Sequence, residues 1–406
     1  MRATTLLNKL LLHNLRGLRV AGFRFVNGDL VLRIRQAFRR LTCPHCGFCK
    51  AGMESRRERR WRHLGIWGQT VYLEGEIRRL RCPKHGVVTE AVPWARHGSD
   101  FTRPLEDAVA LLAQKTDKTA VSELFGISWV TVSNIAKRVV VEKLDPERFK
   151  ALRRIGVDEI SFRKRHRYLT VVTCHDSRRV IWVAEGKSAD VLKRFFELIG
   201  AEACKRIAIV TMDMSGAYQK AVQDCLPNAQ IAFDHFHIAK LANEALNEVR
   251  RELMREAETD EAKAIVKGMM WPTLHRMNNL TDCQLQMLGK LRPEQPLGRA
   301  YLLKETLLDI LHLRIASARQ GLDRWLAWAS RCRLQPFVKL GGTIKRHLAG
   351  VLTLFKERVT NGLAEGMNNK IRLLSHRAYG FHSAAPLIAT IYLCCGGITL
   401  PHLQLL

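Results

Sequence analysis

The sequence predicts a multidomain protein with a zinc-binding β-rich module, then a helix-turn-helix, then an α/β domain interrupted by an all-helical segment. Three observations support this prediction. The 406 residues exceed what one ordinary hydrophobic core holds. Two cysteine-containing ligand pairs lie within the first 90 residues. The apolar period changes from strand-like to helical near Phe101, becomes mixed after Pro146, and is helical again from about Ile238.

The charge of the chain is strongly positive. Lys and Arg number 66 against 38 Asp and Glu, which gives a formal net charge of +28. Such a charge attracts polyanions, and double-stranded DNA is the partner that we expect. A membrane partner is not expected, because the basic residues are spread along the chain and the apolar stretch 387–406 is interrupted by Gly396, Gly397 and Pro401.

Cysteine usage indicates the cellular compartment. The chain has 11 cysteines, an odd number, and few of them are closely spaced. This fits a reducing environment better than a disulfide framework, so we expect a cytoplasmic protein.

Residues 1–98 are expected to form the β-rich module. Cys43-Pro-His-Cys46 and Cys82-Pro-Lys-His85 each separate two ligands by two residues, which lets both side chains of a turn reach one cation. The spacing predicts a structural zinc site, with Cys49 and His45 as alternative ligands. Nearby arginines offer phosphate contacts: Arg56, Arg57, Arg59, Arg60, Arg78, Arg79 and Arg81.

Residues 99–146 are expected to contain the helix-turn-helix. Two helical stretches meet at Gly126, and Ser128 is placed to cap the second. The helical spacing predicts that both helices share a buried face made by Val121, Leu124, Ile127, Val132 and Ile135. The residues predicted to face outward, toward a DNA groove, are Trp129, Thr131, Ser133, Asn134 and Arg138.

Residues 147–240 have the alternation of an α/β domain. Strands are expected at 155–161, 168–173, 180–184, 207–211 and 230–233, and helices at 189–199 and 217–224. Residues 241–358 show helical patterns alone, including one predicted helix over 302–318. Final helices are expected within 359–406.

Two acids of the α/β domain lie where a divalent cation could be held. Asp158 lies in a short strand, and Asp213 follows an apolar strand at its carboxyl end, where α/β sheets place their sites. Carboxylates are ligands that Mg²⁺ or Mn²⁺ prefers, and a pair of such ions can orient the attacking and leaving oxygens of a phosphodiester.

Glu365 is the third candidate acid. It shares one predicted helix face with Asn368, Asn369 and Arg372, because these positions follow at i+3, i+4 and i+7. An exposed, purely structural helix face is an equally good interpretation of this polar pattern.

In this order, these motifs resemble the DDE transposases of the ISL-three group of bacterial insertion sequences, over nearly the whole chain. Beyond the cysteine pairs, the similar segments are Val157-Asp-Glu-Ile160 with Tyr168-Leu-Thr-Val-Val172, Asp213-Met-Ser215 with Tyr218, Asp234-His-Phe-His237 with Lys240, Thr360-Asn361 with Glu365-Gly366, Asn368-Asn369 and Ile371, and Ala378-Tyr-Gly-Phe381. The chain departs from the group at Thr173-Cys-His-Asp176, where Asp176 is expected to form only a turn.

The resemblance implies an RNase H-like catalytic domain whose acids are Asp158, Asp213 and Glu365, with a helical insertion between the second and third. It assigns supporting roles to Asp234 and His237, in which His237 hydrogen-bonds the scissile phosphate or a flipped nucleotide; an equally good interpretation is that the pair only ties a strand end to the next helix. It also implies binding of terminal inverted repeats and of target DNA, assembly as a homodimer or larger oligomer, and association with the bacterial nucleoid. Water would cut the strand at the element's end, and the freed 3′ hydroxyl would attack the target.

Two other functions remain as alternatives: a DNA-binding regulator derived from an inactive transposase, and a nuclease without strand transfer.

Two further groups of residues lie in the predicted helical segment 241–358. Trp271, Trp325 and Trp328 are predicted to be core residues, although base stacking is the alternative. Lys339, Lys345, Arg346 and His347 form a basic cluster that suits contact with DNA.

Overall fold

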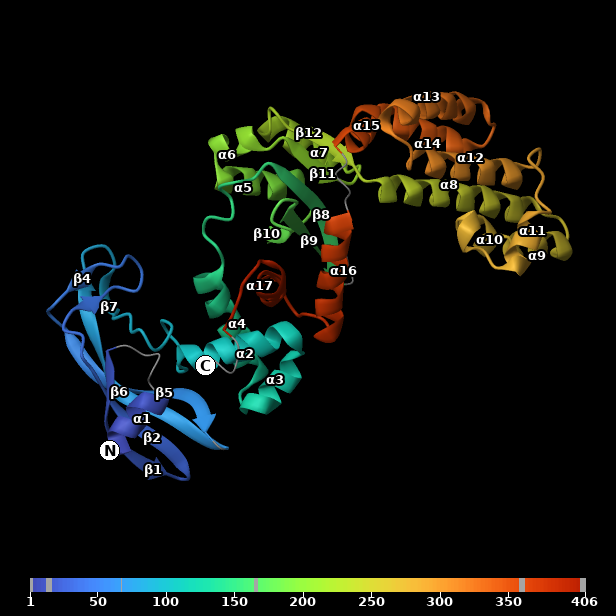
Figure 1. The fold of residues 1–406 in the computed structure, drawn as a ribbon. Helices are drawn as coiled ribbons and strands as arrows, with labels where there is room; N and C mark the ends of the chain where they lie inside the picture. The colour runs from blue at the N-terminus through green and yellow to red at the C-terminus, as the bar shows by residue number, and fades with distance from the viewer. Residues whose placement is uncertain (1–2, 12–16, 67, 164–166, 358–361, 402–406) are drawn as a thin grey trace. The chain divides into compact units, whose positions relative to one another are not determined.

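The computed structural model describes residues 3–11, 17–66, 68–163, 167–357 and 362–401. Thr360 and Asn361 lie outside these residues. The chain divides into two compact units, which are described separately: residues 1–145 with 376–379 and 385–406, and residues 146–375 with 380–384. Figure 1 shows the elements of both units along the chain.

The first unit begins with a β-rich module, as the alternating pattern predicts. Its main sheet has the order β1-β2-β6-β5, with β7 also paired to β6. Trp61 and Leu73 are cross-strand partners in its core, and Trp94 packs edge-on against Trp61. The elements are α1 (Ala3–Leu11), β1 (Leu18–Val26), β2 (Asp29–Gln36), β3 (Leu41–Thr42), β4 (Cys49–Lys50), β5 (Ser55–Ile66), β6 (Gln69–Cys82) and β7 (Gly86–Thr89).

Helices complete the first unit. They are α2 (Arg103–Lys115), α3 (Lys118–Phe125), α4 (Trp129–Lys143) and, from near the carboxyl end, α17 (Ala384–Cys395). Leu393 of α17 shares a buried cluster with Val109 of α2 and Val140 of α4, and the Gln114 side chain donates to the Leu393 carbonyl. The apolar stretch near the carboxyl end therefore contains a packed helix.

The second unit is built around a mixed five-stranded sheet of order β10-β9-β8-β11-β12. Strands β8, β9 and β10 are antiparallel, whereas β8, β11 and β12 run parallel. Gly156 is required by close packing, because a Cβ there would lie 2.7 Å from Thr173 Oγ1. The strands are β8 (Arg154–Arg163), β9 (Arg167–Cys174), β10 (Arg179–Glu185), β11 (Ile209–Met212) and β12 (Gln230–Phe233), and the helices among them are α5 (Ala189–Ile199), α6 (Ala201–Arg206) and α7 (Gly216–Cys225).

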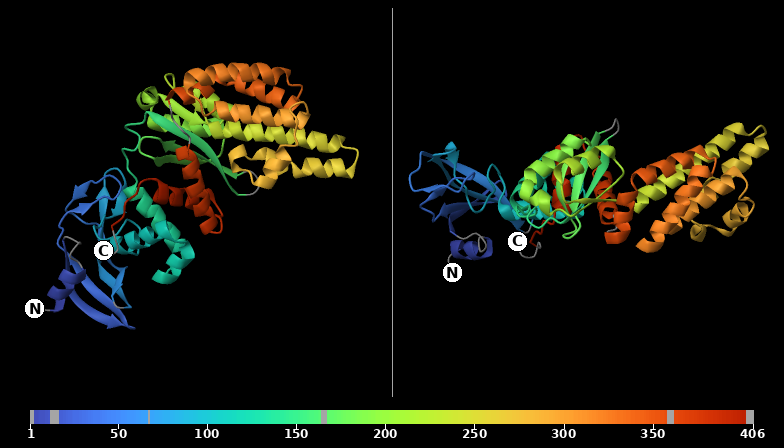
Figure 2. Two further views of the ribbon diagram at one scale, coloured as in Figure 1. Left: turned by 45° about the vertical axis from the view of Figure 1, so that its right-hand side comes forward. Right: turned by 90° about the horizontal axis from the view of Figure 1, so that it is seen from above.

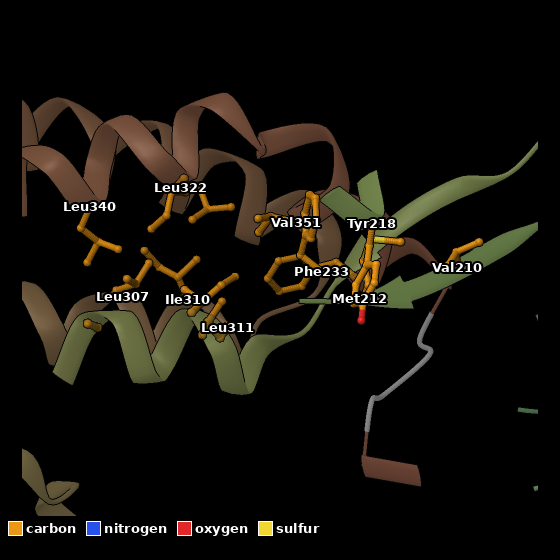
Figure 3. Packing of buried hydrophobic residues seen from close by; sticks show 14 of the residues in the cluster. Val210, Met212, Tyr218, Phe233, Leu307, Ile310, Leu311, Leu322, Leu340 and Val351 are labelled. Carbon is orange, nitrogen blue, oxygen red and sulfur yellow. The ribbon is translucent and has the colours of Figure 1, made fainter. Parts of the chain in front are cut away.

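A helical segment follows β12, and Figure 2 shows its long helices running beside one another in both views. Its apolar side chains continue the core of the sheet: Phe233 and Val351 meet at the end of the helices in Figure 3. The helices are α8 (His235–Glu256), α9 (Asp260–Gly268), α10 (Met270–Leu274), η1 (Met277–Asn279), α11 (Asp282–Leu288), α12 (Pro296–Ile310), α13 (Ile315–Arg331), α14 (Gln335–Arg346), α15 (Leu348–Glu357) and α16 (Gly362–Arg377).

The prediction of a single helix over 302–318 is wrong. The chain turns between Ile310 and Ile315, and α13 folds back on α12 so closely that a Cβ on Gly321 would lie 3.0 Å from Ile310. Leu307 and Leu322 point into the same core from the two helices. The apolar spacing therefore continues across the turn, and periodicity alone does not reveal the break.

Across the described part of the chain, no single helix has the length and apolar character to cross a membrane. The bent pair α3 and α4 passes that test only when its two helices are taken together.

Candidate active site and DNA-binding elements

Four predicted zinc ligands lie together in the first unit. The Sγ atoms of Cys43, Cys46 and Cys82 and a ring nitrogen of His85 all lie within 4.8 Å of one another. Cys82 Sγ is 3.6 Å from Cys46 Sγ and 3.5 Å from His85 Nδ1. Three thiols and one imidazole at this spacing fit a tetrahedral zinc site closed to other ligands.

The local backbone explains why the two pairs converge. Gly47 and Gly86 adopt left-handed φ angles of 73° and 66° just after the second ligand of each pair, which turns each loop sharply. Burial raises the pKa of Cys82, but hydrogen bonds with His85 and with the backbone outweigh burial and lower this pKa to about 6. The thiolate that zinc requires is therefore favoured.

The two alternative ligands lie outside this group. Cys49 is exposed, and its thiol donates to the Gly47 carbonyl at 3.2 Å. The His45 ring packs between those of His85 and His97, at centroid distances of 5.1 and 5.4 Å. Neither residue is needed to complete the set of four.

Most of the arginines predicted to contact phosphate around the zinc module are held in ion pairs with acidic side chains. Arg78 pairs with buried Glu90 at 2.7 Å, and four others pair with acids: Arg56 with Glu76, Arg59 with Asp100, Arg60 with Glu74 and Arg81 with Glu54. Among the described residues, Arg57 and Arg79 have no acidic partner. The surface available to phosphate is therefore smaller than the sequence indicates.

Helices α3 and α4 have the geometry of a helix-turn-helix. Gly126 ends α3 in the left-handed conformation, and the Ser128 hydroxyl accepts from the Thr131 backbone N–H, as the sequence predicts. The helices meet at 102°, inside the range of about 90–120° for this motif. Val121, Val132 and Ile135 are fully buried between them.

Several side chains of this motif differ from prediction. Leu124 is 69% exposed. Ser133 is buried. Its hydroxyl donates a hydrogen bond to the Trp129 carbonyl one turn back and accepts one from Lys118 Nζ. Arg138 is half-buried and pairs with Glu106, which is fully buried. Trp129 and Asn134 are exposed, and Thr131 is partly so. Of the predicted outward residues, Ser133 therefore faces the interior, and Arg138 is held by an internal ion pair.

In the second unit, Asp158 is a half-buried carboxylate on β8. Its Oδ1 accepts from the Glu159 backbone N–H at 2.7 Å, and its Oδ2 accepts from Asn368 Nδ2 on α16. Burial raises the pKa of Asp158, and the nearby charge of Asp213 raises it further, whereas the hydrogen bonds and His237 lower it. The charged form of Asp158 is thus disfavoured until a positive charge lies beside it.

Asp213 directly follows β11, so the parallel pairing of β8 and β11 brings it to the same end of the sheet as Asp158. Its Oδ1 accepts from the Ser215 backbone N–H, and its Oδ2 lies 3.7 Å from His237 Nε2. Asp234 is buried and caps α8 by accepting from the Phe236 N–H, which fixes the first turn carrying His237. Asp234 and His237 are thereby placed beside Asp213.

Helix α16 carries the remaining predicted residues. Asn368 is buried against Asp158, whereas Glu365, Asn369 and Arg372 are exposed, and Arg372 donates to Asn369 at 3.3 Å. Glu365 lies one helical turn before Asn368. Residues spaced in this way are neighbours on a helix surface, so Glu365 projects beside the residue that contacts Asp158.

The donor set around Asp158 fits a divalent cation. Burial and the nearby charge of Asp213 raise the pKa of Asp158, and a bound cation would offset both effects. Among the described residues, only the zinc ligands have three or more ligand atoms mutually within 4.8 Å. Asp158, Asp213 and Glu365 are therefore not drawn together as tightly as the zinc ligands are.

Glu159 and Lys187 were missed by the sequence analysis. Glu159 is half-buried opposite Thr170, on the other face of the sheet from Asp158. Burial raises its pKa, and Lys187 opposes that effect. Thr170 in turn hydrogen-bonds the buried Tyr218 hydroxyl at 2.9 Å. The available signal was that Glu159 directly follows Asp158, a candidate metal ligand. Because side chains alternate along a strand, Glu159 was expected on the opposite face of the sheet from Asp158.

The tryptophans of the helical segment divide into two groups. Trp325 is buried and donates to the Leu303 carbonyl at 2.8 Å, and Trp328 packs against the same cluster. Trp271 is 58% exposed beside His275, so the prediction that it is a core residue is wrong. The residues that α10 buries are Pro272 and Thr273.

Comparison with known families gives three matches in chain order. Residues 39–85 match the model described as the zinc-finger of transposase IS204/IS1001/IS1096/IS1165. Residues 90–140 match the helix-turn-helix domain of transposase family ISL3. Residues 155–391 match the DDE model of the same family, described as Transposase.

Curated relatives are similar along most of their length. The transposase for insertion sequence element IS1557 of Mycobacterium tuberculosis is 38% identical over 91% of this chain and 89% of its own. The transposase for insertion sequence element IS1001 of Bordetella parapertussis is 30% identical over 84% of this chain and 85% of its own. Among solved structures, a chain of a simian T-cell lymphotropic virus intasome in complex with a PP2A regulatory subunit covers 46% of this chain and 76% of its own at 15% identity, with a TM-score of 0.17, which is too low to bear on the fold.

Proposed function

As a member of the ISL3 family of insertion-sequence transposases, the chain binds DNA and catalyses its cleavage and transfer, and we propose that Asp158, Asp213 and Glu365 are the acids that carry out this chemistry. The hydrogen bond from Asn368 to Asp158 is the observation that carries the proposal. It joins the helix of the third acid to the strand of the first.

The second unit is proposed to be an RNase H-like catalytic domain with a helical insertion. Its strand order, with three antiparallel strands followed by two parallel ones, supports this proposal. The helices from α8 to α15 lie between the second acid and the third in sequence. We propose the domain limits 147–240 and 359–406 for the catalytic part, 241–358 for the insertion, 1–98 for the zinc module and 99–146 for the helix-turn-helix.

Asp158 and Asp213 would hold a pair of Mg²⁺ or Mn²⁺ ions, and Glu365 would complete one of the two sites. When bound, such ions stabilise the charge that develops on the phosphate and its leaving oxygen. Asn368 orients the Asp158 carboxylate by donating to Oδ2. His237, whose Nε2 lies 3.7 Å from Asp213 Oδ2, would donate a hydrogen bond to a phosphate bound beside Asp213.

Structural zinc is held by Cys43, Cys46, Cys82 and His85, which fold the module that precedes the helix-turn-helix. We propose that this module contacts phosphate through Arg57 and Arg79, while α4 reads bases of the terminal inverted repeat through Trp129, Thr131 and Asn134. Two element ends must be joined together, so we propose a homodimer or larger assembly.

Incubation of the purified chain with Mg²⁺ and DNA that carries the element's ends tests this function. A transposase cuts at the ends and joins the freed 3′ hydroxyl to a second DNA. Cutting without joined products would indicate a nuclease without strand transfer. Binding without any cutting would indicate a regulator derived from an inactive transposase, and either result would overturn the assignment.

A further inference from the structure

The helical segment contains a long run of sequence without acidic side chains. Between Asp323 and Glu357 there are seven Lys and Arg residues and no Asp or Glu. The run covers the end of α13, all of α14 and most of α15. Charge of a single sign attracts a polyanion, and no nearby carboxylate in this run offsets it.

The outward face of α14 carries part of this charge. Gln335, Lys339, Gly342 and Arg346 follow one another at intervals of four, three and four residues, so they form one stripe along the helix. All four are exposed, whereas the opposite face of α14 is buried. Lys339 and Arg346 have no acidic partner within the described part of the chain. These four residues are called the α14 stripe.

The predicted basic cluster is therefore divided by the fold. The ring of His347 is half-buried and packs against Phe233 at 5.1 Å between centroids. Lys345 is exposed but lies to one side of the stripe, because it follows Gly342 by three residues and precedes Arg346 by one. Lys339 and Arg346 remain as the cations of the outward face.

Gly342 is an unusual residue for the middle of an exposed helix face. Glycine lowers helix stability relative to alanine. Beyond its own helical backbone, a Cβ on Gly342 would have no atom of the described chain within 4 Å. The neighbouring Gly341 differs, since its Cβ would lie 3.3 Å from the Ala329 Cβ. Internal packing therefore does not call for glycine at position 342, and what glycine provides there is close approach by another molecule's backbone.

Arg333, in the turn before α14, shows the opposite choice. Its φ is 60°, in the left-handed region that glycine adopts without strain. Its side chain is exposed and has no acidic partner among the described residues. The sequence thus has glycine where alanine would be more stable, and arginine where glycine would be. Both choices oppose folding, and both favour contact with a negatively charged backbone.

We propose that the α14 stripe, with Arg333, binds the sugar-phosphate backbone of target DNA, the duplex to which the element's end is joined. Lys339 and Arg346 lie on either side of Gly342 and are about 10 Å apart along the helix axis, because a helix rises about 1.5 Å per residue. This length matches about three phosphates of one strand of a duplex. Gly342 would let that strand lie directly on the helix.

The absence of base-reading groups favours target DNA as the occupant. Phosphate contacts carry no sequence information, which suits a duplex of variable sequence, whereas the terminal repeat is assigned to α4. The stripe also leads toward the catalytic sheet. Arg346 precedes His347, which packs on Phe233 at the end of β12, and Asp234 follows Phe233 beside the proposed acid Asp213. The inference rests on the proposed strand transfer to a second DNA.

The test uses the full-length, zinc-loaded chain with Ca²⁺ in place of Mg²⁺. The chain is first saturated with unlabelled DNA that carries the element's end, so that the helix-turn-helix is occupied. A labelled duplex without an element end is then titrated by fluorescence anisotropy at several salt concentrations. The double variant Lys339→Ala with Arg346→Ala should bind this duplex about tenfold more weakly, and its slope of log affinity against log salt should be smaller by about 2, one for each lost phosphate contact.

Two further variants separate charge from shape. Gly342→Leu keeps every cation and should melt no lower than the wild type, because leucine favours the helix and has open space there. It should nevertheless bind the labelled duplex about tenfold more weakly, since the strand can no longer approach its phosphate contacts. Lys267→Ala is the matched control, because Lys267 is an exposed cation on α9 without an acidic partner in the described chain. It should leave affinity and slope nearly unchanged.

The proposal is overturned if the double variant binds the labelled duplex like the wild type, or if Lys267→Ala weakens binding equally. It is also overturned if Gly342→Leu binds normally, or if Gly342→Leu melts well below the wild type, because the glycine would then serve internal packing. Equal weakening of labelled end DNA would make the element's own end the occupant and would contradict the assignment to target DNA. Because the assay measures binding, Asp158→Asn should behave in it like the wild type, so a failure of the catalytic assignment is detected separately.

Discussion

Asn368 on α16 donates a hydrogen bond to the carboxylate of Asp158 on β8, across 210 positions of sequence. The bond joins the last helix of the second unit to the first strand of its sheet. Because Asn368 is buried while the flanking Asn369 is exposed, the two neighbouring amides have different roles. Asn368 is a positioning residue for the proposed metal-binding acid.

Asn368→Ala should therefore lower the cleavage rate by about tenfold to a hundredfold, the size expected when the group that orients a metal ligand is removed. The Mg²⁺ concentration needed for half-maximal cleavage should rise, because the Asp158 carboxylate loses a donor that favours its charged form. Asn369→Ala is the control and should leave both values nearly unchanged. Equal effects of the two variants would refute the positioning role.

Asp158→Asn should stabilise the metal-free protein while abolishing cleavage. Burial and Asp213 raise the pKa of Asp158, so the folded state binds a proton more readily than the unfolded chain does. The stabilising contribution of the protonated form is present at low pH, and it is lost as pH rises through the raised pKa. At neutral pH, replacing the charge should raise the free energy of unfolding by about 1 kcal/mol.

Thermal melting with and without Mg²⁺ measures this effect. The wild-type melting temperature should rise when Mg²⁺ is added, and that of Asp158→Asn should not. At low pH, where Asp158 is protonated, the two proteins should melt more nearly together. A metal-free Asp158→Asn that melts well below the wild type would show that the carboxylate contributes to stability and is not strained.

The zinc cluster gives a prediction that separates Cys82 from Cys49. Cys82→Ser should lose bound zinc, as measured by atomic absorption, and should lower the melting temperature by about 5 °C or more, because structural zinc contributes directly to folding. Cys49→Ser should retain zinc and stability, since Cys49 is exposed and lies outside the four ligands. Zinc loss in Cys49→Ser alone would reverse the ligand assignment.

In the helix-turn-helix, Arg138 and Asn134 should respond differently to truncation. Arg138→Ala removes a partner of the fully buried Glu106, whose remaining partners among the described residues are Arg96 and Ser99, and should cost about 1–3 kcal/mol of stability. Asn134→Ala should leave stability unchanged and weaken binding to the element's ends, relative to unrelated DNA, by about 1–3 kcal/mol. Denaturant melts and competition binding distinguish the two. A stable Arg138→Ala with reduced end binding would place Arg138 in the groove.

Local signals explain what could be predicted from the sequence. The strand 230–233 and the helix 189–199 have the predicted limits, because their apolar periods are bounded by turn residues. The cysteine pairs predicted a cluster because metal spacing is a local property. Gly126 and Ser128 likewise specify the turn and cap of the helix-turn-helix without reference to the rest of the fold.

What the sequence could not predict depends on packing across the chain. Ser133 looks like a surface serine until Lys118 and the Trp129 carbonyl are seen to satisfy its hydroxyl. The helical face of α16 allowed Glu365 or Asn368 to meet Asp158, and only the packing of that helix places Asn368 there. A pocket along β12 brings together α7 and α15, which are more than a hundred residues apart in the sequence.

Cleavage of end-bearing DNA in Mg²⁺ by Glu365→Gln tests the catalytic assignment most directly, because the place of Glu365 beside Asp158 follows only from its spacing to Asn368 on α16. Cleavage should fall by about a thousandfold or more, as for removal of a catalytic group, while DNA binding is retained. Glu357→Gln, on α15, is the matched control and should cut normally. If Glu365→Gln cuts as fast as the wild type, the three acids do not form one active site.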